Sequence, residues 1–147
     1  MTVAYRFPKS EKEFEDYFLF RWIWLRKPLG LERGSEQDQL EDTAFHIAAF
    51  DNEKIIAVGR VQIENNASAR IRYMAVNKEH RKQGIGSRVL EELEKIATEK
   101  MAKSCWLYAR ETATTFYTKN HYKVNGEADS VLEIPHFRME KELSALL

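Results

Sequence analysis

Residues 79–93, EHRKQGIGSRVLEEL, place two closely spaced glycines and several basic side chains directly before an amphipathic helical pattern. A helix that begins near Gly84 leaves its first backbone amides without partners inside the helix, and the helix dipole adds partial positive charge there. Gly84 and Gly86 remove side chains that would keep a ligand away from these amides. Arg81 and Lys82 add charge. The segment therefore predicts a site for a phosphorylated ligand, with a pyrophosphate as its natural occupant.

Two other phosphate-binding motifs fit this segment less well. A P-loop requires Gly-x-x-x-x-Gly-Lys-Ser/Thr, and no glycine stands at the required distance before Gly84 with that ending. A dinucleotide fingerprint requires a third glycine where Val89 stands, and it follows the first strand of a βαβ unit. Gly-Ile-Gly alone also suits an ordinary solvated turn. The more specific signal is the longer string VNKEHRKQGIGSRVL.

Composition narrows the class of protein. The chain has 147 residues with 23 basic and 23 acidic side chains, so no net positive field would recruit nucleic acid. Cys105 is the single cysteine, which excludes an internal disulfide and fits a reducing cytoplasm. No run approaches the ~20 apolar residues of a membrane span, and the start does not resemble a signal peptide. We expect a cytoplasmic protein with no membrane, nucleic-acid or metal partner.

The first half of the chain predicts a strand, a helical region and then three strands. Ser10 and Glu13 form a capping-box pattern for a helix that reaches about Lys27. The polar segment 34–44 predicts a loop with one short helix. The three strand-like runs are separated by DNE and ENNAS, which are typical of turns, so they predict an antiparallel meander. The strand-like runs of this half are residues 3–7, 45–50, 54–63 and 69–76.

The second half alternates helices and strands. Apolar residues recur at helical spacing from Ile85 to Ile96. Strand 104–110, helix 112–120 and a hairpin of 121–126 with 134–141 follow. We predict a mixed α/β (α+β) fold in one domain, residues 1–147, with a twisted, mostly antiparallel sheet of about six or seven strands flanked by helices. The expected order is strand, two helices, three strands, helix, strand, helix and two strands.

Two stretches of this sequence resemble the signatures of the GNAT superfamily of N-acetyltransferases. YMAVNKEHRKQGIGSRVLEELE resembles its acetyl-CoA-binding motif, a strand followed by Arg/Gln-x-x-Gly-x-Gly/Ala and a helix. Arg81, Gly84 and Gly86 fill that motif. WLYARETATTFYTKNHYKVNG resembles the second signature, a strand followed by a helix that carries a Phe-Tyr pair. The resemblance spans nearly the whole chain.

This resemblance implies a fold, an activity and site residues. The fold would be GNAT-like, and acetyl-CoA would donate its acetyl group directly to a primary amine in a ternary complex. A CoA-binding sensor or interaction module without turnover is the alternative. Main-chain groups of Met74, Ala75 and Val76 would pair with the pantetheine arm and offer an amide to the thioester oxygen. The CoA pyrophosphate would bind at what we call the cofactor loop, which comprises Arg81, Lys82, Gln83, Gly84, Ile85, Gly86 and Ser87.

Tyr117 matches the family's tyrosine that protonates the departing thiolate. A phenol of pKa ~10 is a sufficient acid for a thiolate whose thiol has a pKa of ~8.5; aromatic packing is the alternative role. Arg110 stands where many members carry an asparagine that contacts the cofactor, and we keep it as a cofactor-binding residue. His121 and Tyr122 replace the Gly-Phe that many members have after this helix.

The acceptor is predicted only as a small-molecule or peptide amine. A protonated amine must lose a proton before it attacks, and several residues in predicted loops and strand ends could accept that proton. Loop acids are commonly solvated and histidines beside strands are commonly structural, so none is singled out. Cys105 begins a buried strand and is not expected to carry the acyl group. The candidate bases are Glu41, Asp42, His46, Glu111 and His136.

Arginines follow the predicted meander at positions 60, 70 and 72. Arg70 and Arg72 share one face of their strand. If this face lines the cleft, the pocket is cationic and favours an acceptor with a carboxylate or phosphate. If it faces solvent, the arginines keep the sheet soluble. We favour the cleft for Arg72 and solvent for Arg70.

The first predicted helix is apolar nearly all round, with too many aromatic residues for one buried stripe. It would wall an acceptor pocket or form the interface of a homodimer. Trp22 and Trp24 are two residues apart and point ~200° apart on a helix, so one of them is expected to line a pocket or an interface.

Overall fold

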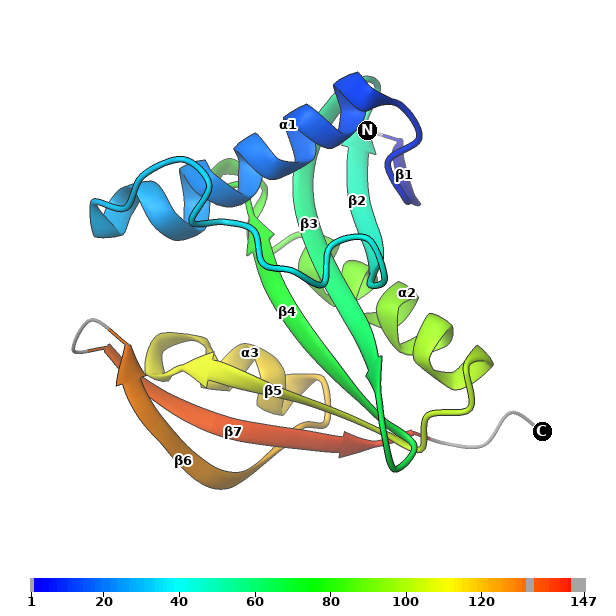
Figure 1. Ribbon diagram of the computed structural model, residues 1–147, viewed down its shortest axis with the longest axis vertical. Helices are drawn as coiled ribbons and strands as arrows, with labels where there is room; N and C mark the ends of the chain where they lie inside the picture. Colours follow the sequence, from blue (N-terminus) through cyan, green and yellow to red (C-terminus); the bar gives the residue numbers. More distant parts are fainter. Residues whose placement is uncertain (1, 132–133, 144–147) are drawn as a thin grey trace.

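A seven-stranded twisted sheet forms the centre of the computed structural model, which describes residues 2–131 and 134–143 (Figure 1). The strand order is β1-β2-β3-β4-β5-β7-β6, and every neighbouring pair is antiparallel except β4 with β5. This confirms the predicted mixed, mostly antiparallel sheet. The strands are β1 (Val3–Arg6), β2 (Phe45–Asp51), β3 (Lys54–Glu64), β4 (Ser68–Val76), β5 (Ser104–Arg110), β6 (Lys123–Val131) and β7 (Ile134–Glu142).

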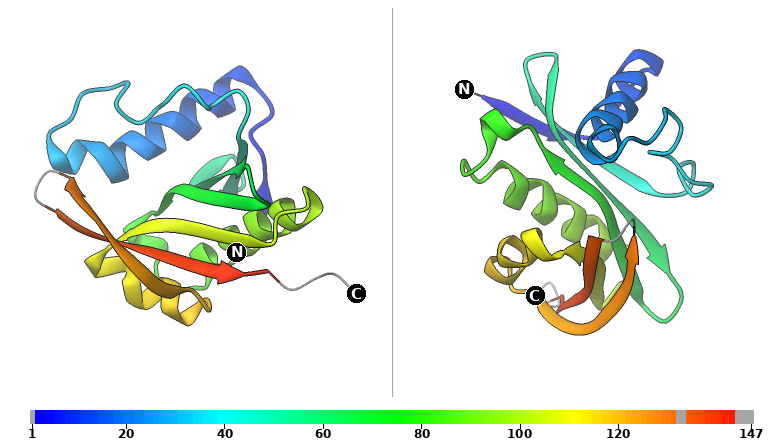
Figure 2. Two further views of the ribbon diagram at one scale, coloured as in Figure 1. Left: turned by 60° about the horizontal axis from the view of Figure 1, so that its bottom comes forward. Right: turned by 90° about the vertical axis from the view of Figure 1, so that its left-hand side faces the viewer.

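Helices cover both faces of the sheet. One face carries α1 (Glu11–Arg21), and the other carries α2 (Ile85–Glu99) and α3 (Thr114–Lys119), as Figure 2 shows. Each face has its own apolar core, because residues alternate between the two sides along every strand. Short helical segments lie in the connections: η1 (Trp22–Arg26), η2 (Lys27–Leu29), η3 (Lys78–His80) and η4 (Glu111–Ala113).

The first helix begins as predicted and ends differently. Ser10 caps it, with its hydroxyl oxygen accepting from the Glu13 amide at 3.1 Å, while the Glu13 carboxylate accepts from the Lys9 amide at 2.8 Å. The α-helix ends at Arg21 and continues as the π-helix η1 and the 3₁₀ turn η2. The predicted short helix within residues 34–44 is wrong, because that segment consists of turns held by side chains.

Most aromatic residues of the first helix are used by the protein's own core. Tyr17 and Phe20 are buried against β2, β3 and β4, and Phe14, Phe18 and Trp24 pack against the same cluster. Much of the apolar surplus is therefore packed within the chain, while Leu19 and Ile23 of the same segment each keep 37% of their surface exposed. In residues 2–131 and 134–143, no helix has the length and apolarity needed to cross a bilayer.

A bulge in β4 opens the sheet. Tyr73 adopts a φ of 58°, and the register between β3 and β4 shifts between Val58 and Arg60. Bulges bend a strand and increase its twist. β4 and β5 pair only over Ser68–Arg70 and Ser104–Trp106, and the two strands then separate (Figure 1).

Gly59 lies between the residues where the register shifts, and a side chain there would collide with the core. A Cβ atom at this position would lie 2.6 Å from Met74 Sδ and 2.8 Å from Leu93 Cδ1. We expect Gly59→Ala to lower the free energy of unfolding by about 1–3 kcal/mol through overpacking, measured by urea denaturation. Gly126→Ala is the control, because its Cβ would meet only Arg138 Cβ at 3.7 Å. Equal stability of both variants would contradict the steric argument.

Candidate active site

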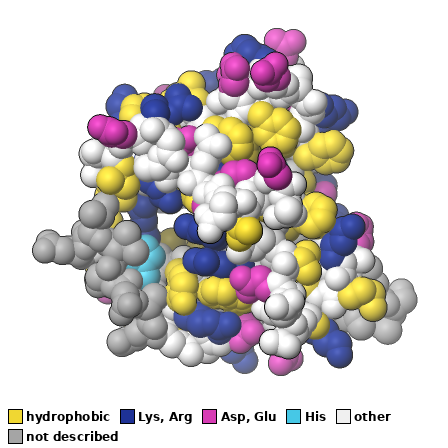
Figure 3. Space-filling view, viewed as in Figure 1, with side chains coloured by type: hydrophobic (Ala, Val, Ile, Leu, Met, Phe, Trp, Pro, Cys, Tyr) yellow, Lys and Arg dark blue, Asp and Glu magenta, His cyan; other side chains and the backbone are white. Residues whose placement is uncertain are grey.

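The separation of β4 and β5 creates a cleft of about 1270 Å³. It extends from the start of α2 to η1 and η2, and residues of β4, β5, η4, α3 and β7 form its walls. Figure 3 shows a hollow between the α1 side of the molecule and the β5 side, with Lys and Arg side chains gathered in it. The cleft is large enough for an extended ligand.

The cofactor loop lies at one end of this cleft. Arg88 donates the first hydrogen bond of α2, from its amide to the Gly84 carbonyl oxygen at 3.0 Å. The amides of residues 85–87 therefore have no acceptor inside the helix. Lys82 and Gly84 both adopt left-handed conformations, with φ of 64° and 78°. Left-handed residues at every second position turn successive amides toward one concave surface, which is an anion-binding geometry.

The two glycines of the loop have different roles. A Cβ atom on Gly84 would meet no protein atom within 4 Å, so this position is open on the ligand side. A Cβ atom on Gly86 would lie 3.1 Å from Val76 Cγ2 and 3.3 Å from the Phe116 ring. Gly86 is therefore required for the packing of α2 against β4 and α3, a role that the sequence did not indicate.

Within residues 2–131 and 134–143, the cleft-facing edge of β4 has no strand partner beyond Arg70. Met74, Ala75 and Val76 line the cleft along this edge. An unpaired strand edge offers alternating amides and carbonyl groups to an extended ligand. Arg81 joins the loop to this edge, since its Nε donates to the Val76 carbonyl oxygen at 3.3 Å.

Tyr117 reaches the cleft from α3. The residue is only 8% exposed, and its ring packs edge-on against those of Phe116 and Tyr122. Burial raises the pKa of Tyr117, so the phenol holds its proton at neutral pH. Among the described residues, none forms a hydrogen bond with the Tyr117 hydroxyl, whereas the Tyr122 hydroxyl donates to Glu94 at 2.8 Å. Of these two tyrosines, Tyr117 has the hydroxyl available to a ligand.

Comparison with known proteins shows the family of this chain. The sequence model of the acetyltransferase (GNAT) family matches residues 7–122, which is most of this chain and includes the cofactor loop and Tyr117. The chain belongs to the GNAT acetyltransferase family. The predicted superfamily is confirmed.

Individual relatives agree with this assignment. The Bacillus subtilis (strain 168) protein YjcF, described as an uncharacterized N-acetyltransferase, is 31% identical over 135 residues, which cover 91% of this chain and 96% of YjcF. A crystal structure from Lactobacillus plantarum has the same fold at 19% identity, with a TM-score of 0.86 over 98% of this chain and 100% of that one. The crystal structure of PaiA N-acetyltransferase from Thermoplasma acidophilum, in complex with coenzyme A, has a TM-score of 0.76 at 22% identity. The match covers 97% of this chain and 99% of that one.

His121 and Tyr122 depart from the common GNAT pattern, but both support the local backbone and packing of this region. His121 adopts a φ of 74°, the left-handed conformation that glycine adopts most easily. Tyr122 is buried, and its hydroxyl is bonded to Glu94, which also pairs with Lys141 at 2.9 Å. Tyr122 therefore has a structural role in this GNAT protein.

Four arginines line the part of the cleft formed by η1, β4 and β5, which we call the acceptor end: Arg26, Arg70, Arg72 and Arg110. Arg70 faces the cleft, so the prediction that it faces solvent is wrong; its Cζ lies 4.9 Å from the ring centre of Trp106. Arg72 lines the cleft as predicted and pairs with Asp38 at 2.9 Å. Arg110 donates from Nη2 to a carbonyl oxygen of η1 at 3.4 Å, across the cleft.

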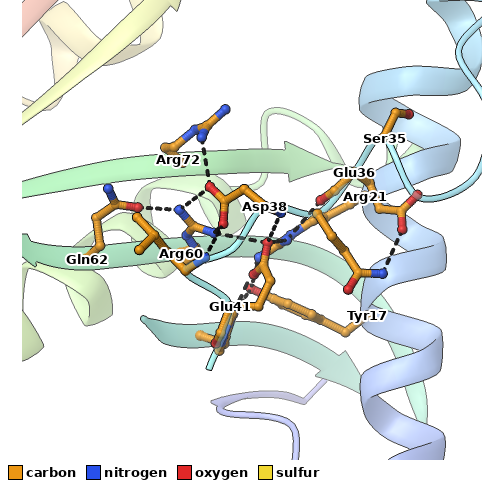
Figure 4. Close-up of polar contacts among 12 residues, drawn as sticks. Tyr17, Arg21, Ser35, Glu36, Asp38, Glu41, Arg60, Gln62 and Arg72 are labelled. Atoms are coloured by element: carbon orange, nitrogen blue, oxygen red, sulfur yellow. Dashed lines mark hydrogen bonds and ion pairs between the residues drawn. The ribbon is translucent and has the colours of Figure 1, made fainter. Parts of the chain in front are cut away.

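A buried ionic network supports this end of the cleft (Figure 4). Arg60 has no exposed surface and pairs with Asp38 at 2.8 Å and with Glu41 at 3.0 Å. Arg21, also fully buried, pairs with Glu41 at 2.9 Å. Hydrogen bonds from Arg60 hold the pKa of Asp38 at about 2, well below its usual range. Burial alone would raise the pKa of Glu41, but hydrogen bonding and charge from Arg21 lower it overall.

The structure separates the five candidate bases. His46 is buried, bonded through Nδ1 to the Tyr17 hydroxyl at 2.9 Å and through Nε2 to the Glu41 carbonyl oxygen at 2.8 Å, and burial lowers its pKa. Glu41 is held by the ionic network, and Asp42 and Glu111 are exposed residues outside the cleft. His136 is the one that lines the cleft. Its Nδ1 donates to a β7 carbonyl oxygen at 2.8 Å, which leaves Nε2 as the acceptor of a neutral ring.

The single cysteine and the two tryptophans of η1 lie where the sequence predicted. Cys105 is fully buried, and burial raises the pKa of its thiol to about 12, which is consistent with its exclusion as an acyl carrier. Trp24 lines the cleft, whereas Trp22 donates its indole N–H to the Leu31 carbonyl oxygen at 2.9 Å. The prediction that one of the two tryptophans lines a pocket is confirmed.

Proposed function

We propose that this GNAT protein transfers the acetyl group of acetyl-CoA directly to a primary amine. The observation that carries the proposal is the meeting of an anion-binding loop, an unpaired strand edge and a buried tyrosine hydroxyl in one cleft. The residues fit the cofactor: the amides of 85–87 are free, Gly84 is open, and Arg81 and Lys82 add positive charge. The coenzyme A in the PaiA structure supports the same choice of ligand.

Each part of the cleft then has a binding role. The amides of residues 85–87 bind the pyrophosphate, with Arg81, Lys82, Gln83 and the Ser87 hydroxyl around it. Met74, Ala75 and Val76 pair with the pantetheine arm through the edge of β4. An amide of this strand end donates to the thioester oxygen and stabilises the negative charge that develops there. Acetyl-CoA supplies the activated acyl group.

Two residues move the protons in this proposal. His136 Nε2 accepts a proton from the amine, whose nitrogen then forms the bond to the acyl carbon while the carbon–sulfur bond breaks. After the attack the nitrogen is positively charged and loses a second proton, while Tyr117 gives its own proton to the departing sulfur. One of the two protons released by the amine restores Tyr117, and the other passes to solvent. Burial keeps Tyr117 protonated until a thiolate is buried beside it. The cytoplasmic location and a homodimer stay predictions from the sequence.

Thermal unfolding with added ligands tests the binding step. We expect acetyl-CoA and CoA to raise the melting temperature, by an amount equivalent to ~2.7 kcal/mol at a hundredfold excess over Kd, and ATP and NAD to leave it unchanged. Lys82→Glu should reduce the shift because it reverses a charge in the cofactor loop. Lys54→Glu is the matched control, because Lys54 is exposed and outside the cleft. A shift with ATP or NAD, or none with acetyl-CoA, would overturn the proposal.

A further inference from the structure

Positive charge gathers at the acceptor end of the cleft. Arg26, Arg70, Arg72 and Arg110 line this end, and His136 lies in the same wall. Among residues 2–126 and 134–143, whose side chains the structure describes, neither an aspartate nor a glutamate lines the cleft. An unbalanced cationic surface inside a partly desolvated cleft is costly for the free protein. It becomes favourable when an anionic ligand binds there.

The two carboxylates of the buried ionic network are already engaged. Asp38 pairs with Arg60 and Arg72, and Glu41 pairs with Arg60 and Arg21. Three guanidinium groups therefore share two carboxylates, and the network has no spare negative charge for the other arginines. Neither of its carboxylates lines the cleft, and Asp38 contacts the cleft wall through Arg72.

Arg70 is the least satisfied of the four. Its Nε is buried without a hydrogen-bond partner, and no described residue forms an ion pair or hydrogen bond with its guanidinium group. The Cζ of Arg70 lies 4.9 and 5.2 Å from the ring centres of Trp106 and Tyr108. The nearby carboxylate of Glu64 accepts from the Trp106 indole N–H at 2.7 Å. Two aromatic rings thus hold a guanidinium group in place, with its hydrogen-bond donors unused.

Arg26 and Arg110 add charge from across the cleft. Arg26 donates to the carbonyl oxygens of Ser35 and Leu25, and Arg110 donates to that of Leu25. Among residues 2–126 and 134–143, no carboxylate forms an ion pair with either of them. Arg26 and Arg72 lie over the same ring, that of Tyr73, with their Cζ atoms 5.4 and 4.6 Å from its centre. Burial lowers the pKa of Arg26, and the charges of Arg72 and Arg110 lower it further.

We propose that the acceptor of this enzyme is an amine that also carries a carboxylate or phosphate group, which Arg70 binds together with Arg26 and Arg110. The inference rests on the proposed acetyl transfer and names its substrate class. It moves Arg110 from the cofactor side of the cleft to the acceptor side. Planar guanidinium groups bind carboxylate and phosphate through paired hydrogen bonds, so the anion fixes the orientation of the amine. The same charges disfavour polyamines, aminoglycosides and lysine-rich peptides.

Matched pairs of amines test the substrate class. The probes are L-glutamate against L-glutamine, β-alanine against β-alaninamide, and O-phosphoethanolamine against ethanolamine, with spermidine and kanamycin as cationic acceptors. CoA release measures turnover with acetyl-CoA, and calorimetry with the CoA-saturated protein measures acceptor binding without turnover. We expect the anionic member of at least one pair to be favoured by about ten- to hundredfold, the usual effect of a hydrogen-bonded charge. The pair that responds distinguishes carboxylate from phosphate.

Two arginine variants separate a specific role from a general effect of charge. Arg70→Ala should raise the KM or Kd of the anionic acceptor about ten- to hundredfold and leave acetyl-CoA binding unchanged. Arg138→Ala is the matched control: its Cζ also lies near the Trp106 ring, at 4.7 Å, but it bonds to Asn125 and Glu140 and does not line the cleft. It should behave as the wild type.

The outcomes distinguish this inference from the proposed function. Acetylation of the neutral or cationic probes in preference to the anionic ones overturns the anionic acceptor and leaves acetyl transfer intact. Normal binding of acetyl-CoA with no binding of any anionic probe overturns it as well, as does an Arg70→Ala variant that keeps the wild-type KM. Failure to bind acetyl-CoA at all overturns both.

Discussion

Tyr117→Phe is expected to lower kcat by about 10²–10⁴-fold, the usual contribution of a positioned general acid. The substitution removes one oxygen and keeps the ring that packs against Phe116 and Tyr122. Because no described residue bonds to the Tyr117 hydroxyl, its loss leaves no broken hydrogen bond in the protein. The KM for acetyl-CoA and the melting temperature should therefore change little. Steady-state kinetics at saturating acetyl-CoA, with a parallel thermal scan, measure these quantities.

Tyr122→Phe is the matched control for this prediction. It removes the same atom from a tyrosine whose hydroxyl donates to Glu94 at 2.8 Å in the core. We expect the free energy of unfolding to fall by about 1–3 kcal/mol, because the buried Glu94 carboxylate loses a hydrogen-bond donor, and we expect kcat to be retained. A Tyr117→Phe variant with wild-type kcat would remove Tyr117 as the acid. If the wild-type protein binds acetyl-CoA but turns over none of the acceptors, a CoA-binding sensor is favoured instead.

Of the substitutions proposed for this protein, Asp38→Asn should lower the free energy of unfolding most. Asp38 accepts two hydrogen bonds from the fully buried Arg60, at 2.8 and 2.9 Å, and one from Arg72 at 2.9 Å. Removing one partner of a buried ion pair leaves an uncompensated charge, and we expect a loss of about 3 kcal/mol, the low end of the usual range because Glu41 still pairs with Arg60. For a chain of this length, that loss lowers the melting temperature by roughly 6–12 °C.

The same variant should change the pH dependence of stability. The pKa of Asp38 is about 2 in the folded protein, against 3.8 for an ordinary aspartate. A carboxyl whose pKa is lowered by folding stabilises the protein above its unfolded pKa, and that contribution fades as the pH falls from about 4 to about 2. The difference in unfolding free energy between the wild type and Asp38→Asn should shrink across this window.

Asp16→Asn provides the comparison for Asp38→Asn. Asp16 pairs with Lys12 at 2.8 Å one helical turn away on the surface, where such a pair contributes at most about 0.5 kcal/mol. Denaturant titrations of both variants between pH 2 and pH 7 would test the prediction. A loss for Asp38→Asn no greater than that for Asp16→Asn would show that the network does not support the fold.

Local patterns in the sequence predicted much of the fold because their physics is local. The meander follows from strand periodicity and turn residues, and the Ser10 cap forms between residues three positions apart. The cofactor loop was predictable for the same reason: a glycine that adopts a φ of 78° and the free amides of a helix start are properties of consecutive residues. The helix expected within 34–44 was wrong because its polar side chains bond instead to turns and to the ionic network.

The sequence by itself predicted the family, the cofactor loop and the tyrosine that lines the same cleft, since each depends on short spacing along the chain. Only the tertiary structure decided the character of the acceptor end. Asp38 and Arg60 are 22 residues apart and Arg110 and Leu25 are 85 apart, so no local pattern could pair them. β4 and β5 separate beyond Arg70, whose side chain lines the cleft, and no carboxylate among residues 2–126 and 134–143 lines it. Which charges remain unpaired depends on how all the surrounding elements pack, because each carboxylate can neutralise only the guanidinium groups within its reach.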